Sequence, residues 1–126
     1  MKITTFNTLI VTKDAENVIK LFEALGFERR HSLDAKTGEQ DLTSVRMKNA
    51  DGFHVDIAQV EGYSADRDMT LIRMNVDNFE EAYEFLISKG FMCHSGGVAV
   101  ETATNKSCCM IAPSGFAFVL CQHIKD

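Results

Sequence analysis

Residues 8–27 have the sequence TLIVTKDAENVIKLFEALGF, in which an apolar stretch precedes a helix-forming segment and a final Gly-Phe pair. Residues 69–91, MTLIRMNVDNFEEAYEFLISKGF, repeat this order, and their Gly90 lies 64 positions after Gly26. Further along, residues 115–120, GFAFVL, resemble residues 52–57, GFHVDI, at a spacing of 63 positions. Two similarities at nearly one spacing indicate that the second half of the chain is a copy of the first.

The first half predicts a strand, a helix and three further strands. Residues 3–12 are mostly β-branched or apolar, which favours a strand. Asp14 is expected to cap a helix that runs to about Leu25. Helical spacing predicts its buried stripe as Val18, Leu21, Phe22 and Leu25. The further strands are expected at residues 27–33, 42–48 and 53–60, with a polar loop at residues 35–40.

The second half predicts the same order. Residues 69–76 are expected to form a strand, and Asp77 or Asn78 to cap a helix that ends at about Lys89. The buried side of this helix is expected to hold Ala82, Phe85 and Leu86. The remaining strands are expected at residues 92–101, with an interruption at the Gly-Gly pair 96–97, and at residues 107–112 and 116–124.

The 126 residues therefore predict one domain of the α+β class, with two tandem βαβββ modules. Module one spans about residues 1–60, a polar linker about 61–68, and module two about 69–126. In each module one helix covers one face of the sheet and leaves the other face open. Two such modules side by side would form a curved mixed sheet with a concave cleft, and ligands prefer concave sites.

Composition excludes several classes of protein. The formal net charge is -5, and the 13 Lys and Arg residues are scattered, so a nucleic-acid-binding surface is not expected. No apolar run approaches the roughly 18 residues that a membrane span needs. No charged-then-apolar signal segment stands at the start of the sequence, so we expect a cytoplasmic protein.

The four cysteines, Cys93, Cys108, Cys109 and Cys121, include no CxxC pair that would indicate zinc binding or redox chemistry. Cys108 and Cys109 are adjacent, so on a strand their side chains would point to opposite faces. We expect all four to be small buried apolar residues in a reducing compartment.

The duplicated βαβββ order resembles the vicinal oxygen chelate superfamily, which includes glyoxalases and bleomycin-resistance-like proteins, over essentially the whole chain. Local patterns add to the resemblance: the Asp-capped first helix, the Val-Asp-Asn at residues 76–78, and the Pro-Ser-Gly-Phe turn at residues 113–116. In the family's usual Asp-Pro-Asp-Gly turn, acids stand where this chain has Ala112 and Ser114. The resemblance implies a glyoxalase-like domain and a homodimer.

The resemblance places the family's four metal-ligand positions at Asn7, Asp56, Leu71 and Val119. Leu and Val side chains cannot coordinate a cation, and an Asn offers only a neutral amide oxygen. A zinc, nickel or iron site needs about three ligands from His, Cys and carboxylates. We therefore expect no metal and no other cofactor.

Strand alternation adds neighbours to these positions. His54 shares a face with Asp56, and Cys121 shares a face with Val119. Arg73 and Asn75 follow Leu71 on its face. The candidate ligand-binding residues are thus Asn7, His54, Asp56, Leu71, Arg73, Asn75, Val119 and Cys121.

The charged residues among these candidates could form a metal site or an ion pair, or bind a ligand. A relocated metal site from His54 and Asp56 is disfavoured, because residues two apart lie about 6–7 Å apart along a strand and Arg73 adds a positive charge. Arg73 is expected either to pair with Asp56 or to bind an anionic group of a ligand.

The sequence favours a metal-independent protein that binds a small organic molecule in the concave cleft, and it assigns no catalytic residue. The alternative is a metal-dependent lyase, isomerase or dioxygenase of the same superfamily with an altered metal site. A third hypothesis is an interaction module whose cleft is vestigial. Whether the modules pair within one chain or across a dimer also remains open.

Overall fold

The computed structural model describes residues 1–37, 40–60, 67–93, 100–101 and 105–123. They fall into two compact units, of which the first unit is Asn7–Thr70 and the second unit is Met1–Phe6 with Leu71–Asp126. The strand β1 (Ile3–Thr12) therefore contributes residues to both units. The concave cleft expected from the sequence remains a prediction.

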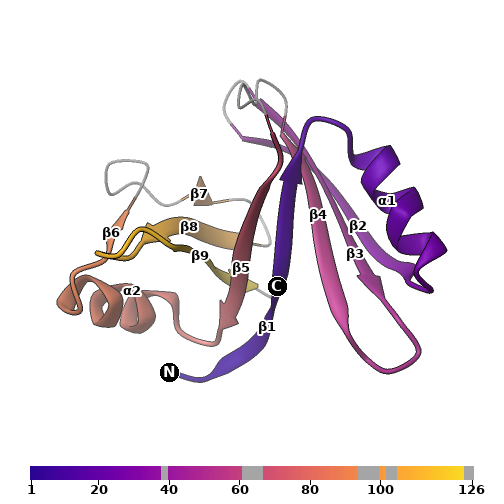
Figure 1. Ribbon diagram of the computed structural model, residues 1–126. Helices are drawn as coiled ribbons and strands as arrows, with labels where there is room; N and C mark the ends of the chain where they lie inside the picture. Colours follow the sequence, from indigo (N-terminus) through magenta and orange to yellow (C-terminus); the bar gives the residue numbers. More distant parts are fainter. Residues whose placement is uncertain (38–39, 61–66, 94–99, 102–104, 124–126) are drawn as a thin grey trace. The chain divides into compact units, whose positions relative to one another are not determined.

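The first unit contains one helix and one mixed sheet. After β1 come α1 (Ala15–Ala24), β2 (Glu28–Thr37), β3 (Gln40–Lys48) and β4 (His54–Val60). The strand order is β2-β3-β4-β1, in which β1 runs parallel to β4 and the other pairs are antiparallel (Figure 1). The βαβββ order predicted for this half is confirmed.

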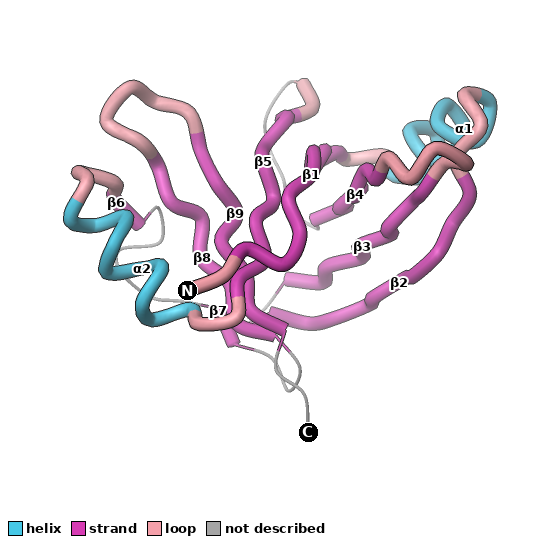
Figure 2. The backbone as a smooth tube through the Cα atoms, turned by 90° about the horizontal axis from the view of Figure 1, so that it is seen from below, coloured by secondary structure: helices cyan, strands magenta, loops and turns pink. Residues whose placement is uncertain are grey.

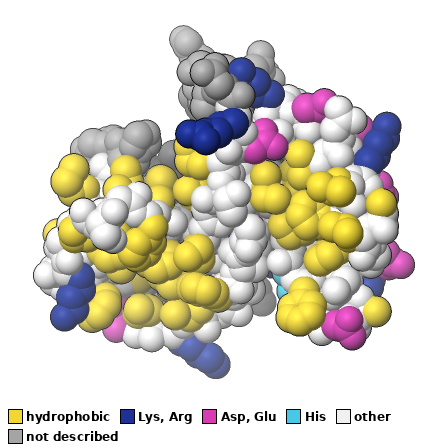
Figure 3. Space-filling view, in the orientation of Figure 1, with side chains coloured by type: hydrophobic (Ala, Val, Ile, Leu, Met, Phe, Trp, Pro, Cys, Tyr) yellow, Lys and Arg dark blue, Asp and Glu magenta, His cyan; other side chains and the backbone are white. Residues whose placement is uncertain are grey.

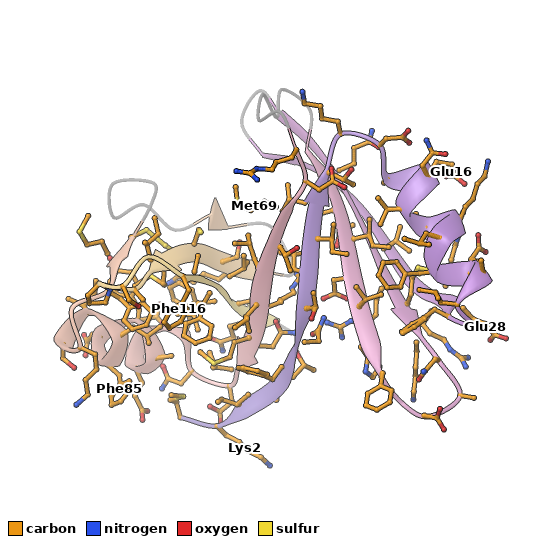
Figure 4. All side chains as sticks on the ribbon, viewed as in Figure 1. Lys2, Glu16, Glu28, Met69, Phe85 and Phe116 are labelled. Atoms are coloured by element: carbon orange, nitrogen blue, oxygen red, sulfur yellow. A yellow bond between two sulfur atoms is a disulfide. The ribbon has the colours of Figure 1, made fainter. Side chains whose placement is uncertain are left out.

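The second unit has the same order, except that two short strands, β6 and β7, stand where the first unit has β2. Its elements are β5 (Met69–Val76), α2 (Phe79–Ser88), β6 (Met92–Cys93), β7 (Val100–Glu101), β8 (Asn105–Ile111) and β9 (Ala117–His123). The strand order is β6-β8-β9-β5, and β7 also pairs with β8 (Figure 2). β5 runs parallel to β9, as β1 does to β4. The α+β class is confirmed.

The register of the strands repeats residue by residue. Leu9 pairs with Asp56 in the first unit, and Arg73 pairs with Val119 in the second. These two pairs are related by the spacings seen in the sequence: Leu9 of β1 and Arg73 of β5 are 64 residues apart, and Asp56 of β4 and Val119 of β9 are 63 residues apart. Arg46 opposite Asp56 likewise corresponds to Cys109 opposite Val119. The internal repeat is therefore present in the hydrogen-bonded register.

The helix starts are built in the same way in both units. Asp14 and Asn78 cap α1 and α2, each accepting a hydrogen bond from a backbone N–H three residues on. A glutamine of the last strand adds a bond that the sequence did not predict. The Gln59 Oε1 accepts from the Ala15 N–H at 2.9 Å, and the Gln122 Oε1 accepts from the Phe79 N–H at 2.7 Å.

We expect Gln122→Leu to lower the free energy of unfolding by about 1–2 kcal/mol, because the first N–H of α2 then loses its acceptor. Urea unfolding followed by far-UV circular dichroism measures the change. Gln122→Glu separates the two bonds of this side chain, since it keeps an oxygen facing the Phe79 N–H but loses the Nε2 donor to the Asp77 backbone oxygen. If the Leu variant matches the wild type within about 0.5 kcal/mol, the bond contributes nothing measurable.

The predicted buried stripes of the helices are confirmed in part. In α1, Val18 and Phe22 pack against the core beside the buried Ala15 and Ile19. Leu21 and Leu25 were also predicted to be buried, but they are 56% and 62% exposed. In α2 the predicted Ala82 and Leu86 are buried, but Phe79 takes the place of Phe85. The sequence pattern predicted where the helices lie, but it predicted only in part which side of each helix faces the sheet. That side begins with the first residue of the helix, Ala15 in α1 and Phe79 in α2, and both are buried.

The prediction of a polar loop at residues 35–40 is wrong. β2 continues to Thr37 and β3 begins at Gln40, and the last register pairs include Lys36 with Asp41. Backbone hydrogen bonds between antiparallel strands do not depend on apolar side chains, so polar composition did not end the strand. Residues 38–39 of the predicted loop lie outside the described residues.

Candidate functional site

In each unit the strands have one face against the helix and one face without a helix, called here the helix-free face. In the first unit, Val55 and Ile57 of β4 pack with Ile19 of α1, so Asp56 lies on the helix-free face. In the second unit, Met74 of β5 packs with Leu86 of α2. The alternation therefore places every predicted site residue on a helix-free face: Asn7, His54 and Asp56 in the first unit, and Leu71, Arg73, Asn75, Val119 and Cys121 in the second.

A two-point ion pair dominates the helix-free face of the first unit. The Arg46 Nε donates to the Asp56 Oδ1 at 2.8 Å, and the Arg46 Nη2 donates to the Asp56 Oδ2 at 3.1 Å. The Asp56 side chain is 1% exposed and that of Arg46 is 28% exposed. Both carboxylate oxygens therefore receive a charge-assisted hydrogen bond from one guanidinium.

Arg46 was missed in the sequence, where only Arg73 was considered as the partner of Asp56. The Asp-Gly turn at residues 51–52 contained the missing signal, because a hairpin around it sets Arg46 opposite Asp56. An Asp56–Arg73 pair joins residues of different units and stays a prediction.

The other two predicted site residues of this unit are Asn7 and His54. Asn7 is half-buried, and its Nδ2 donates to the backbone oxygen of Thr8 at 3.0 Å. His54 is exposed at the start of β4. The described part of the chain places no three His, Cys, Asp or Glu residues together as a metal-binding group.

The donor atoms do not fit the metal that the resemblance implies. Of the four ligand positions, Leu71 and Val119 have no donor atom. Asn7 is a neutral amide, and Asp56 is held at both oxygens by Arg46. A cation at Asp56 would have to displace a guanidinium or lie beside it, and like charges repel most strongly where water is excluded.

On the second unit, the predicted residues form a contiguous grid on adjacent strands. Arg73 lies beside Val119, and Asn75 lies beside Cys121, in the parallel register of β5 and β9. Cys109 of β8 is opposite Val119 and extends the grid by one strand. Leu71, Arg73, Asn75, Val119 and Cys109 are half-buried, whereas Cys121 is 1% exposed. Burial raises the pKa of the Cys109 thiol, so this side chain is uncharged at neutral pH.

The Asn75 Oδ1 and the Thr5 Oγ1 of the second unit are buried and have no hydrogen-bond partner among the described residues. Most buried polar side-chain atoms in proteins have a partner, so each exception needs an explanation.

Of the four small buried cysteines expected in a reducing compartment, Cys108 and Cys121 are buried, but the expected reduced state is wrong for two of the four. Cys93 of β6 and Cys108 of β8 form a disulfide, with Cα atoms 6.6 Å apart, while Cys109 and Cys121 are not disulfide-bonded. The register pairs Cys93 with Met110, so Cys108 lies one diagonal step away on the same face. Sequence spacing alone showed no CxxC, and the proximity arises only from strand pairing.

The sequence matches no family model, and no curated protein matches it significantly. Solved structures do match. A methylmalonyl-CoA epimerase is 16% identical, with 94% of each chain covered and a TM-score of 0.69. The Streptomyces coelicolor methylmalonyl-CoA epimerase is 13% identical, covering 98% of this chain and 100% of that one, at a TM-score of 0.66. A glyoxalase/bleomycin resistance protein/dioxygenase superfamily member from Vibrio splendidus is 17% identical, at coverages of 96% and 99% and a TM-score of 0.59.

At these identities the comparisons establish the fold. The vicinal oxygen chelate fold expected from the sequence is confirmed. In the part of the chain that the structure describes, neither helix is long and apolar enough to cross a membrane.

Proposed function

We propose that this protein binds a small organic molecule without a metal, and that the helix-free face of the second unit is its binding surface. The observation that carries the proposal is the two-point pair between Arg46 and Asp56. Asp56 is the one carboxylate among the four metal-ligand positions that the resemblance implies, and both of its oxygens are bonded to Arg46 of the same unit.

The pair argues against metal chemistry on energetic grounds. Removing one partner of a buried ion pair costs about 3–5 kcal/mol, because the remaining charge stays buried. A divalent metal that captured Asp56 would leave the Arg46 guanidinium without its carboxylate. The two ligand positions that the resemblance assigns to the second unit, Leu71 and Val119, have no donor atom. Binding of metal is therefore expected to be weak.

The second unit supports the binding of an organic molecule by its composition. Leu71 and Val119 supply half-buried apolar surface, while Arg73 and Asn75 supply polar groups on the same face. Small-molecule sites combine a mostly apolar lining with a few polar groups that fix orientation. A metal-dependent enzyme lacks this support, because the polar groups of the grid include no carboxylate or imidazole.

We expect a screen of small organic compounds by thermal melting to find ligands that stabilise the wild type and lose their effect in Val119→Arg. An arginine in the centre of the grid would cover the apolar surface and add charge. Stabilisation follows because such ligands bind only the folded state. Ni²⁺, Zn²⁺, Fe²⁺ and Mn²⁺, tested in the same screen, are expected to leave the melting temperature unchanged.

The matched control is Leu25→Arg, which places the same charge on a surface residue that is 62% exposed. It should keep every ligand response of the wild type. Near-stoichiometric metal in protein purified without a tag or chelator, lost in Asp56→Asn, would overturn the metal-independent proposal. If the compounds stabilise Val119→Arg and the wild type equally, the helix-free face of the second unit is not the binding surface.

A further inference from the structure

Asn75 has an unusual position for an asparagine in a β-strand. Its Oδ1 is buried, and no donor of the described residues forms a hydrogen bond with it. The amide of Gln122, by contrast, accepts from the Phe79 N–H and donates to the Asp77 backbone oxygen, so it stabilises the fold directly. A buried acceptor without a donor costs stability, which makes Asn75 a poor structural choice at this position.

The neighbours of Asn75 limit what could donate to it. In the register, Cys121 lies beside Asn75, and its Sγ is directed at the backbone oxygen of Val119, 3.8 Å away. Arg73, two residues along β5, shares the same face. A cationic donor such as an ammonium would be repelled by this guanidinium, so the donor best suited to Asn75 is uncharged.

The apolar neighbours limit the rest of the molecule. Leu71 lies four residues before Asn75 on the same face of β5, and Val119 lies one strand away. Both are half-buried and have no polar side-chain atoms. A molecule that reaches Asn75 across this surface is therefore expected to have an aliphatic body.

We propose that Asn75 determines specificity by accepting a hydrogen bond from an uncharged donor, an amide N–H or a hydroxyl, on an aliphatic ligand. This inference rests on the proposed function, because it assigns a role within the same binding surface. It adds the chemical class of the ligand, which the fold does not specify.

The first test needs no ligand. If the Asn75 Oδ1 has no structural partner, Asn75→Leu should unfold at a higher urea concentration than the wild type, because an apolar group replaces the unpaired acceptor. A lower urea midpoint for Asn75→Leu would show that the amide stabilises the fold. That result would overturn the specificity role while leaving the proposed binding surface intact.

The second test uses a matched pair of probes, cyclohexanecarboxamide and its N,N-dimethyl derivative, titrated into ¹⁵N-labelled protein. The primary amide should shift resonances of β5 and β9, and the dimethyl amide should bind at least about tenfold more weakly, a difference of about 1.4 kcal/mol. Asn75→Leu should abolish the discrimination, and Asn75→Asp, which keeps an acceptor oxygen, should retain it.

The outcomes separate the two proposals. Equal binding of both amides to the wild type, with loss of both in Val119→Arg, supports the binding surface and overturns the role of Asn75. Discrimination that survives in Asn75→Leu also overturns that role. If neither amide shifts β5 or β9 and the compound screen is negative, the proposed function and the inference both fail.

Discussion

Arg46→Met is expected to lower the free energy of unfolding by about 3–5 kcal/mol, the usual effect of removing one partner of a buried ion pair. The Asp56 side chain is 1% exposed and receives bonds at both oxygens from Arg46. Methionine keeps much of the apolar stem of arginine, so the lost packing is small. Urea unfolding at neutral pH, followed by circular dichroism, measures the loss.

Two further variants identify its cause. Arg29→Met removes an exposed ion pair with Glu16, whose side chains are 43% and 61% exposed, and should cost less than about 1 kcal/mol. Asp56→Asn in the Arg46→Met background removes the uncompensated charge and should recover part of the stability. If Arg46→Met costs no more than Arg29→Met, the pair does not hold Asp56, and the argument against a metal weakens with it.

The fold was predictable because the same sequence pattern occurs in both halves of the chain. The spacings of 64 and 63 residues set Arg73 where the first half has Leu9, and Val119 where it has Asp56. A slip of one residue in either strand would have turned the candidate residues to the helix side. Strand alternation then placed all of the candidate residues on the helix-free faces, where the structure has them.

The contacts between candidate residues were less predictable, because they depend on partners across strands. Arg46 is ten residues from Asp56 and becomes its neighbour only through the hairpin register. The unpaired oxygen of Asn75 is a property of everything around it, so no local pattern signals it. Cys93 and Cys108, 15 residues apart, meet only because β6 pairs with β8.

The disulfide gives the second large effect. Cys93→Ser is expected to lower the free energy of unfolding by about 3 kcal/mol, the loop-closure value for a loop of about 15 residues. The adjacent residue offers the matched control, since Cys109 is half-buried and carries a free thiol. Cys109→Ser should therefore change stability much less. Dithiothreitol should destabilise the wild type and Cys109→Ser, but not Cys93→Ser.

Thiol counting tests the bond itself. Burial raises the pKa of the Cys109 thiol, which slows its alkylation in the folded protein, so the protein should be unfolded before labelling. Mass spectrometry should then find two labelled cysteines out of four in wild type, and four after reduction. Four labels without reductant would return Cys93 and Cys108 to the buried free thiols that the sequence favoured, and β6 would depend on its hydrogen bonds and packing alone.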